Sequence, residues 1–211
     1  MKEKPILFTT EMIQAIRDGR KTQTRRVVKL PKPHVKDAAW VDDWRERAFF
    51  DAGCLGGPCL HVPCADEHDE YVSRVRSRYE VGDRLWVKER WTDHTHGSKP
   101  RWRSPLFMPK FETRIWLEVI RVRAERVQDI TEIDAGREGV MWDERTARVN
   151  FADLWDSING KPKPIYSKKE IVAYQSFPWS GESGTFEHRG LPHYVQANPW
   201  VWVYDFRSVG K

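Results

Sequence analysis

The chain has 211 residues, which is long enough for one well-filled hydrophobic core or two small ones. Hydrophobic residues make up 39% and charged residues 32%, so a disordered chain is excluded, and the lack of a run of about 18 apolar residues excludes a transmembrane helix. The net charge is +5, but residues 1–36 carry ten Lys and Arg against three Asp and Glu, whereas residues 37–80 carry five against ten. Positive charge is therefore concentrated near the N-terminus, as a site for an anionic ligand requires.

The N-terminal segment and the cysteines bear on location. The first residues, MKEKPILFTTEM, contain acidic residues and too short an apolar run for a signal peptide. Three cysteines form an odd set, which together with the lack of an export signal predicts a protein of the reducing cytoplasm. No segment predicts a membrane partner.

In chain order, the first predicted elements are a short strand at residues 6–8 and a helix. The helix begins after a threonine cap, Thr9 or Thr10, and ends at Gly19. A turn then leads into a strand that ends at residues 27–28. Beyond it, residues 33–80 show no regular periodicity.

The later part of the chain alternates strands with two short helices. Two strands come first, at 85–89 after a Gly82–Asp83 turn and at 115–127. Two helices follow, one from a Thr131 cap to Glu138 with a stop at Gly139 and one over 151–158. The chain then forms a predicted long loop at 161–198 and an aromatic strand at 199–206. Strands dominate and no repeat is present, so the predicted fold class is α+β. The expected architecture is one β-barrel-like domain with short flanking helices and long loop insertions.

The segment GRKTQTRR, residues 19–26, has the composition of a functional site. Four of its eight residues are basic, and two threonines lie between them. A threonine hydroxyl is a poor nucleophile unless a neighbouring base takes its proton, and a lysine is such a base only if its pKa falls toward neutrality. Burial and adjacent cations both lower a lysine pKa. Lys21 and Thr24 point to opposite faces of an ideal strand, so they can share a site only if Lys21 lies in the turn.

Five segments together resemble the ASCH-domain family, in particular its phage- and prophage-encoded branch. They are ILFTTEMIQAIRDGRKTQTRR, VGDRLWVKE, LEVIRVRAERVQDITEIDAGREGV, FADLWDSING and NPWVWVYDF. The resemblance implies that residues 1–211 form a single domain with a PUA-like β-barrel, a fold associated with RNA and modified nucleosides. The variable insertions fall near 33–80, 92–113 and 161–198.

The same resemblance implies a metal-independent amidohydrolase that uses no cofactor and removes an acyl group from a cytidine-type base. The catalytic residues implied by position are Lys21, Thr24 and Glu138. The residues expected to bind the modified nucleoside or RNA are Arg20, Thr22, Arg25, Arg26, Trp86 and Glu89. Two other functions stay open at this point: a ribonuclease, and a non-catalytic RNA-binding module in which the arginines only hold phosphate.

Other residues carry weaker expectations. A zinc site made by Cys54, Cys59, His61 and Cys64 is a minor alternative, because their spacing is irregular and ordinary packing of the cysteines is favoured. Trp86 is expected in the core, with a place in the site as the alternative. Glu89 is expected to pair with Arg25 or Arg26, or to replace Glu138 as the working carboxylate. Trp200 and Trp202 alternate with valines, which predicts that only one of the two sets faces the core.

Overall fold

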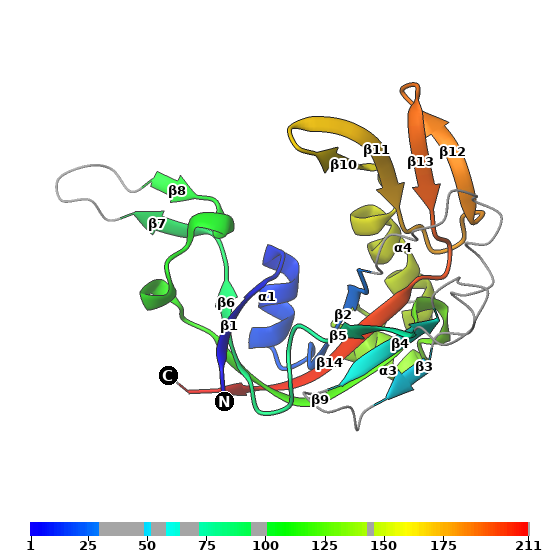
Figure 1. Ribbon diagram of the computed structural model, residues 1–211. Helices are drawn as coiled ribbons and strands as arrows, with labels where there is room; N and C mark the ends of the chain where they lie inside the picture. The colour runs from blue at the N-terminus through cyan, green and yellow to red at the C-terminus, as the bar shows by residue number, and fades with distance from the viewer. Residues whose placement is uncertain (30–48, 52–57, 64–71, 94–100, 143–145, 211) are drawn as a thin grey trace.

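The structure is a computed structural model that describes residues 1–29, 49–51, 58–63, 72–93, 101–142 and 146–210 (Figure 1). The fold is mixed α+β, with more residues in strands than in helices, as predicted. The central element is a five-stranded sheet of order β1-β6-β9-β14-β2, in which only the β1–β6 pair is parallel. Its strands are β1 (Glu3–Leu7), β2 (Gln23–Val27), β6 (Arg84–Lys88), β9 (Trp116–Arg126) and β14 (Trp200–Val209).

The sheet has a hydrophobic core on each face. On β14, Trp202 and Tyr204 belong to the first core, whereas Val201 and Val203 belong to the second. The expectation that only one set faces a core is therefore wrong. A strand that is buried on both faces carries apolar residues at every position. Alternation of tryptophan and valine therefore does not distinguish such a strand from one with a single buried face.

Helix α1 (Thr10–Arg17) covers the first core with Ile13 and Ile16. Thr9 caps it by accepting a hydrogen bond from the backbone N–H of Met12, and Gly19 ends it with a φ of 72°. These boundaries agree with the prediction. The chain then turns, with Lys21 outside β2, which is the arrangement that a shared site with Thr24 requires.

Helices α3 (Glu132–Arg137) and α4 (Ala147–Asn159) lie on the other face of the sheet. Thr131 caps α3 by accepting from the Asp134 N–H, and Glu138 is its C-cap residue, as predicted. Phe151 and Trp155 of α4 pack against the valines of β14 in the second core. None of the helices within the described ranges is both long enough and apolar enough to span a bilayer.

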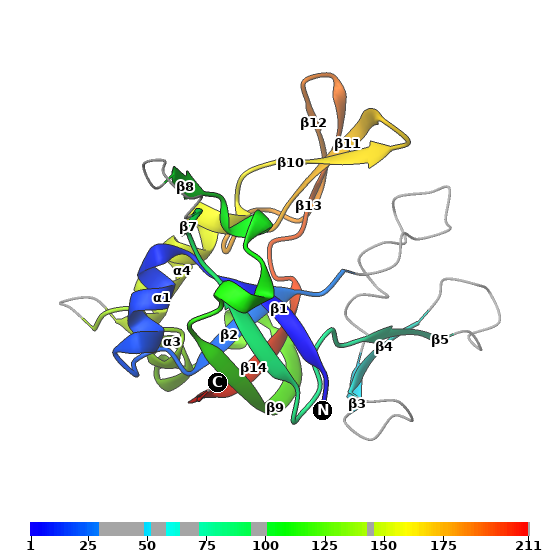
Figure 2. The same ribbon diagram turned by 90° about the vertical axis from the view of Figure 1, so that its left-hand side faces the viewer.

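The central sheet does not close into a barrel in the described part of the chain. β1 and β2 are its two edges and do not pair with each other. A side chain bridges them instead: the Arg26 guanidinium of β2 donates to the carbonyl of Leu7 in β1 at 2.6 Å. In Figure 2 the sheet is seen from the β1 side, with α1, α3 and α4 together at one end.

Three smaller sheets surround the central one. Their strands are β3 (Phe49–Asp51), β4 (Cys59–Pro63) and β5 (Val72–Arg76) in the first, β7 (Trp91–Asp93) and β8 (Arg101–Arg103) in the second, and β10 (Lys163–Ser167), β11 (Glu170–Ser176), β12 (Gly184–His188) and β13 (Leu191–Val195) in the third. Short 3₁₀ turns complete the fold: η2 (Pro105–Phe107), η3 (Lys110–Glu112) and η4 (Val127–Asp129).

The prediction of a long loop at 161–198 is wrong, because this segment forms the third sheet. Its glycines and serines lie in the turns and strand ends, and the strands between are short. Arg189 and Gly190, both with positive φ, connect β12 to β13 in a two-residue hairpin turn. The turn-forming residues of this segment therefore mark closely spaced hairpins and not a continuous loop.

Candidate functional site

Lys21 lies at the junction of α1, β2 and α3, and its side chain is wholly buried. Its backbone N–H donates to the Ala15 carbonyl of α1 at 2.9 Å, which fixes the turn. The Nζ atom donates to two acceptors of one residue, the carbonyl of Glu138 and its carboxylate Oε2, both at 2.7 Å. The expected closeness of Glu138 to Lys21 is therefore present.

Glu138 is held by a second cation. Its other carboxylate oxygen, Oε1, accepts from Nη1 of Arg25 at 3.0 Å, and only 4% of its side chain is exposed. Arg25 already neutralises much of the negative charge of this carboxylate. The buried Glu138 carboxylate therefore keeps a positive partner, Arg25, even when Lys21 is a neutral amine.

The pKa of Lys21 lies below its ordinary value. Burial is the main cause, because removing an ammonium from water favours the neutral amine. The ion pair and hydrogen bond with Glu138 act in the opposite direction, whereas the nearby cations Arg26 and Arg25 lower the pKa further. The sequence left the outcome of this competition open, and in the structure the factors that favour the neutral amine prevail.

Thr24 lies on β2 opposite Tyr204 of β14 and is buried. Side chains alternate along a strand, so Thr24 and Arg26 share the face of the first core, and Gln23 and Arg25 point to the other. Within the described residues the Thr24 hydroxyl makes no hydrogen bond. Among the described residues, the Thr24 hydroxyl is therefore not already engaged with a neighbouring protein atom.

The other face of β2 carries an ion-pair network that the sequence analysis did not identify. Arg25 donates through Nε to Glu125 at 3.0 Å and through Nη1 to Gln23 at 2.6 Å. Arg123 of β9 bonds Asp134 at 2.8 Å and Asp205 at 3.2 Å on the same face. The network joins β2, β9, β14 and α3. The only signal for it in the sequence is the alternation of charges along β9.

Two of the residues expected to bind ligand are committed to the protein itself. Arg25 is 5% exposed and engaged with two carboxylates and the Gln23 amide, so it does not reach a phosphate in this structure. Glu89 is also buried and pairs with Arg17 and Arg114, so the expectation that it pairs with Arg25 or Arg26 is wrong. Both are long polar side chains whose partners come from elements distant in the chain, which local sequence patterns do not reveal.

The remaining predicted binding residues differ in how far they are exposed. Arg20 and Thr22 are exposed beside the cluster, and Arg20 bonds Asp18 and the Gly139 carbonyl. Arg26 is half-buried, with its guanidinium 5.3 Å from the Phe8 ring. Trp86 is half-buried on the outer side of β6, 5.2 Å from Nζ of Lys88, so the expectation that it belongs to the core is wrong.

The cysteine and histidine cluster is described only in part. Cys59 and His61 are buried on β4, with Sγ and Nε2 3.2 Å apart, whereas Cys54 and Cys64 lie outside the described residues. Cys59 is disulfide-bonded. Among the residues that the structure describes, no three His, Cys, Asp or Glu side chains lie close enough to share a metal ion. The expected reducing location stays a prediction.

Compared with known proteins, the chain matches no family model, no curated protein and no solved structure. A neutral Lys21 has two N–H donors, which match its two acceptors on Glu138, and keeps one lone pair to accept a proton. Lys21 and Glu138, defined here as the Lys21 cluster, thus provide a base and a carboxylate that orients the base. Thr24 follows three residues later on β2 and carries a hydroxyl that makes no hydrogen bond among the described residues.

Proposed function

We propose that the chain is a PUA-like protein of the ASCH type that hydrolyses an acyl-amide on a cytidine-type base without a metal ion. The observation that carries the proposal is the Lys21 amine, buried with a lowered pKa and oriented by two acceptors of Glu138. A lysine serves as a general base near neutral pH only when its environment lowers its pKa in this way. The resemblance of GRKTQTRR and the four other segments to the ASCH family supports the same assignment.

In the proposed reaction the Thr24 oxygen attacks the amide carbonyl carbon, and its proton passes to Nζ of Lys21. The negative charge of the tetrahedral intermediate is stabilised by Arg26, the cation on the same face of β2. The intermediate collapses as the C–N bond breaks, and Lys21 returns the proton to the nucleobase amine. Water then hydrolyses the threonine ester, which releases the carboxylic acid and regenerates the hydroxyl.

The second candidate is a non-catalytic module that binds RNA or a modified nucleoside. It is favoured by the burial of the Lys21 cluster, since the Lys21 side chain is wholly buried and that of Glu138 nearly so. A buried ion pair of this kind also occurs in a purely structural role. In that case Lys21 and Glu138 join α3 to β2, and the ligand contacts only the exposed cations around them.

The deciding experiment removes the Thr24 hydroxyl. Purified protein is incubated with a panel of N-acylated cytidines and adenosines and with small RNAs, and the products are separated by chromatography. Thr24→Val keeps the size of the side chain, and because the hydroxyl has no partner to orphan among the described residues, the fold should persist. We expect hydrolysis to fall by a factor of about 100 or more, and Thr24→Ser to restore most of it.

Thr185→Val is the matched control, because it removes an exposed threonine hydroxyl from β12, outside the predicted site. Its rate should equal that of the wild type. Hydrolysis that survives Thr24→Val would contradict the mechanism. Retained ligand binding with unchanged substrates would indicate the binding module, and shortened RNA would indicate a ribonuclease. Glu138→Gln is a poorer test, because it leaves two buried cations without their carboxylate and should destabilise the protein.

A further inference from the structure

One flank of the molecule presents an unusual set of exposed apolar side chains. We define the flank as the β7–β8 hairpin together with turns η2 and η3. Trp102 is 66% exposed, Leu106 63%, Phe107 77% and Phe111 77%. Four large apolar side chains at such exposure within ten residues of chain mark an interaction surface more often than an ordinary surface.

These side chains are held outward by an anchored backbone. Nζ of Lys88 donates to the Leu106 carbonyl at 2.6 Å, and Ser104 caps η2. Between the two turns Met108 points inward, is 2% exposed and accepts through its sulfur from the Glu89 N–H. Thr113, directly after η3, is also fully buried. Because the segment is fixed at these points, its exposed rings form a preorganised surface.

Cations are interleaved with the rings. Residues 84–93 and 101–114 contain seven Lys and Arg but only three Asp and Glu. One of these three acidic residues, Glu89, is buried and pairs with Arg17 and Arg114. The Arg90 guanidinium lies 5.5 Å from the Trp102 ring. The seven cations are Arg84, Lys88, Arg90, Arg101, Arg103, Lys110 and Arg114.

The flank ends in a shallow hollow of about 660 Å³, lined by Glu3, Arg84, Lys110, Phe111 and Trp116. Arg84 and Lys110 lie 4.8 Å and 5.7 Å from the Trp116 ring. The indole N–H of Trp116 is buried and has no hydrogen-bond partner within the described residues. Both cations of the hollow pair with Glu3, so the hollow combines an ion-paired group, an exposed ring and an indole donor without a partner among the described residues.

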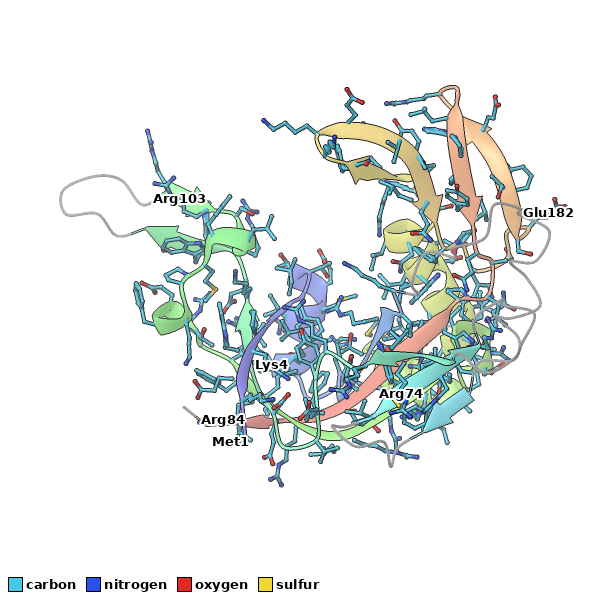
Figure 3. The ribbon with its side chains drawn as sticks, in the orientation of Figure 1. Met1, Lys4, Arg74, Arg84, Arg103 and Glu182 are labelled. Carbon is cyan, nitrogen blue, oxygen red and sulfur yellow. The ribbon has the colours of Figure 1, made fainter. Side chains whose placement is uncertain are left out.

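The elements of the flank follow one another in space. Figure 1 shows the hairpin at the upper left and the two turns below it, leading down to the start of β9. Figure 2, which faces this side, shows the turns between the hairpin and strand β1. In Figure 3 the labelled Arg103 lies at the hairpin end and the labelled Arg84 at the opposite end, near the N-terminus.

We propose that this flank binds single-stranded nucleic acid, with bases stacked on Trp102, Phe107 and Phe111 and phosphates paired with the interleaved cations. Surfaces of this kind combine aromatic platforms with positive charge, because every base has a stacking face and every linkage a negative charge. In a duplex the base faces are covered by neighbouring bases, so duplexes should bind much more weakly. An apolar protein partner or an uncharged membrane would use the rings but would not account for the excess of cations around them.

This inference concerns a surface outside the Lys21 cluster. It adds to the proposed function by naming a polymeric ligand, but it does not need hydrolysis to occur. The two are therefore tested by different measurements. Binding of a labelled oligonucleotide tests the flank, and hydrolysis of a free acylated nucleoside tests the cluster.

The experiment measures fluorescence anisotropy of a labelled oligouridine of about 20 nucleotides, a length that exceeds the usual site of one binding domain. We expect each of Trp102→Ala, Phe107→Ala and Phe111→Ala to weaken binding about tenfold, and their combination to weaken it by at least about a hundredfold. An oligoadenosine should bind comparably, and a duplex should compete at least about tenfold less well. Arg101→Ala with Arg103→Ala should reduce the slope of log affinity against log salt by about 1.4.

Matched controls come from the sheet of β10 to β13. Tyr166 and Phe186 are 59% and 47% exposed there, so Tyr166→Ala with Phe186→Ala removes comparable rings, and Lys161→Ala with Lys169→Ala removes exposed cations. These variants should bind as the wild type does. The proposal is overturned if the oligonucleotide does not bind, if the triple variant binds normally, or if the control variants lose as much affinity. Flank-dependent binding without nucleoside hydrolysis would support this inference and reject the proposed reaction alone.

Discussion

At the scale of single residues, the burial of Lys21 gives this side chain a structural role in addition to any catalytic one. A lysine in an open cleft would contribute little to packing, and its removal would leave the fold intact. Here its side chain is buried against α1 and α3, and its ammonium or amine group joins α3 to the turn before β2. Substitutions of Lys21 therefore alter stability as well as any activity, and the two must be measured together.

The lowered pKa of Lys21 predicts a pH dependence of stability. An unfolded lysine titrates near 10.5, whereas burial lowers the pKa in the folded protein. Between the two values the unfolded chain binds more protons, so raising the pH stabilises the folded state. The contribution is complete above 10.5 and is lost as the pH falls through the lowered pKa.

The measurement compares the wild type with Lys21→Met by urea unfolding at several pH values between neutrality and 10.5. Groups present in both proteins cancel in the difference. The wild type should gain stability relative to the variant as the pH rises, with a slope of at most about 1.4 kcal/mol per pH unit. A difference that stays constant over this range would mean that the folded and unfolded proteins hold the Lys21 proton equally well.

The sequence predicted the Lys21–Glu138 contact but not the role of Arg25. The contact follows from local features, since a glycine ends α1 before Lys21 and a threonine cap fixes α3 so that Glu138 lies at its end. Arg25 resembles its neighbours in GRKTQTRR, and nothing local indicates that its partners are Glu125 and Glu138. Which cations face solvent depends on strand pairing, which a short motif does not contain.

At the scale of elements, Gly139 joins α3 to the Lys21 cluster. Its φ of 87° lies in the left-handed region, and an added Cβ would lie 2.8 Å from Cβ of Lys21 and 2.9 Å from Cβ of Ala15. Gly19 provides a matched position, because it also ends a helix with positive φ but has open space around it. Backbone strain is common to both glycines, and close packing is specific to Gly139.

We expect Gly19→Ala to lower the free energy of unfolding by about 1–2 kcal/mol, from backbone strain alone. Gly139→Ala should lower it by about 1–3 kcal/mol more, because α1 and Lys21 must move away from the new methyl group. Urea unfolding of the two variants measures the difference. Equal losses of unfolding free energy in the two variants would show that α3 moves away from the new methyl group at no cost. The close approach of α3 to Lys21 would then not fix the position of the Lys21 side chain.

The elements themselves divide into those that the sequence predicts well and those that it does not. Caps and glycine stops gave α1 and α3 within a residue or two, and β-branched residues gave β9. The strands β10 to β13 were missed because their flanking Pro, Gly and Ser residues outweighed short alternating patterns. Of these strands only a few side chains, such as Ala173 and Tyr174, are buried, so little hydrophobic signal was available.

At the scale of the whole molecule, the central sheet is curved around its first core but has two unpaired edges within the described residues. A hydrogen bond from Arg26 to the Leu7 carbonyl links β2 to β1 across this opening. The Arg26 guanidinium also lies over the ring of Phe8, the residue directly after β1. Arg26 therefore performs part of the function that strand pairing performs in a closed barrel.

This role predicts a local change in dynamics when Arg26 is removed. Arg26→Met keeps the length and apolar packing of the stem but cannot donate to Leu7, so the edges should separate more often. Hydrogen exchange followed by mass spectrometry should show faster exchange in 3–8 and 23–27, with β9 and the centre of β14 unchanged. Arg207→Met is the control, because Arg207 pairs with Glu118 between adjacent strands and not across the opening. Faster exchange throughout the sheet in Arg26→Met would indicate general destabilisation, and unchanged exchange at both edges would mean that the core alone holds the sheet in its curved form.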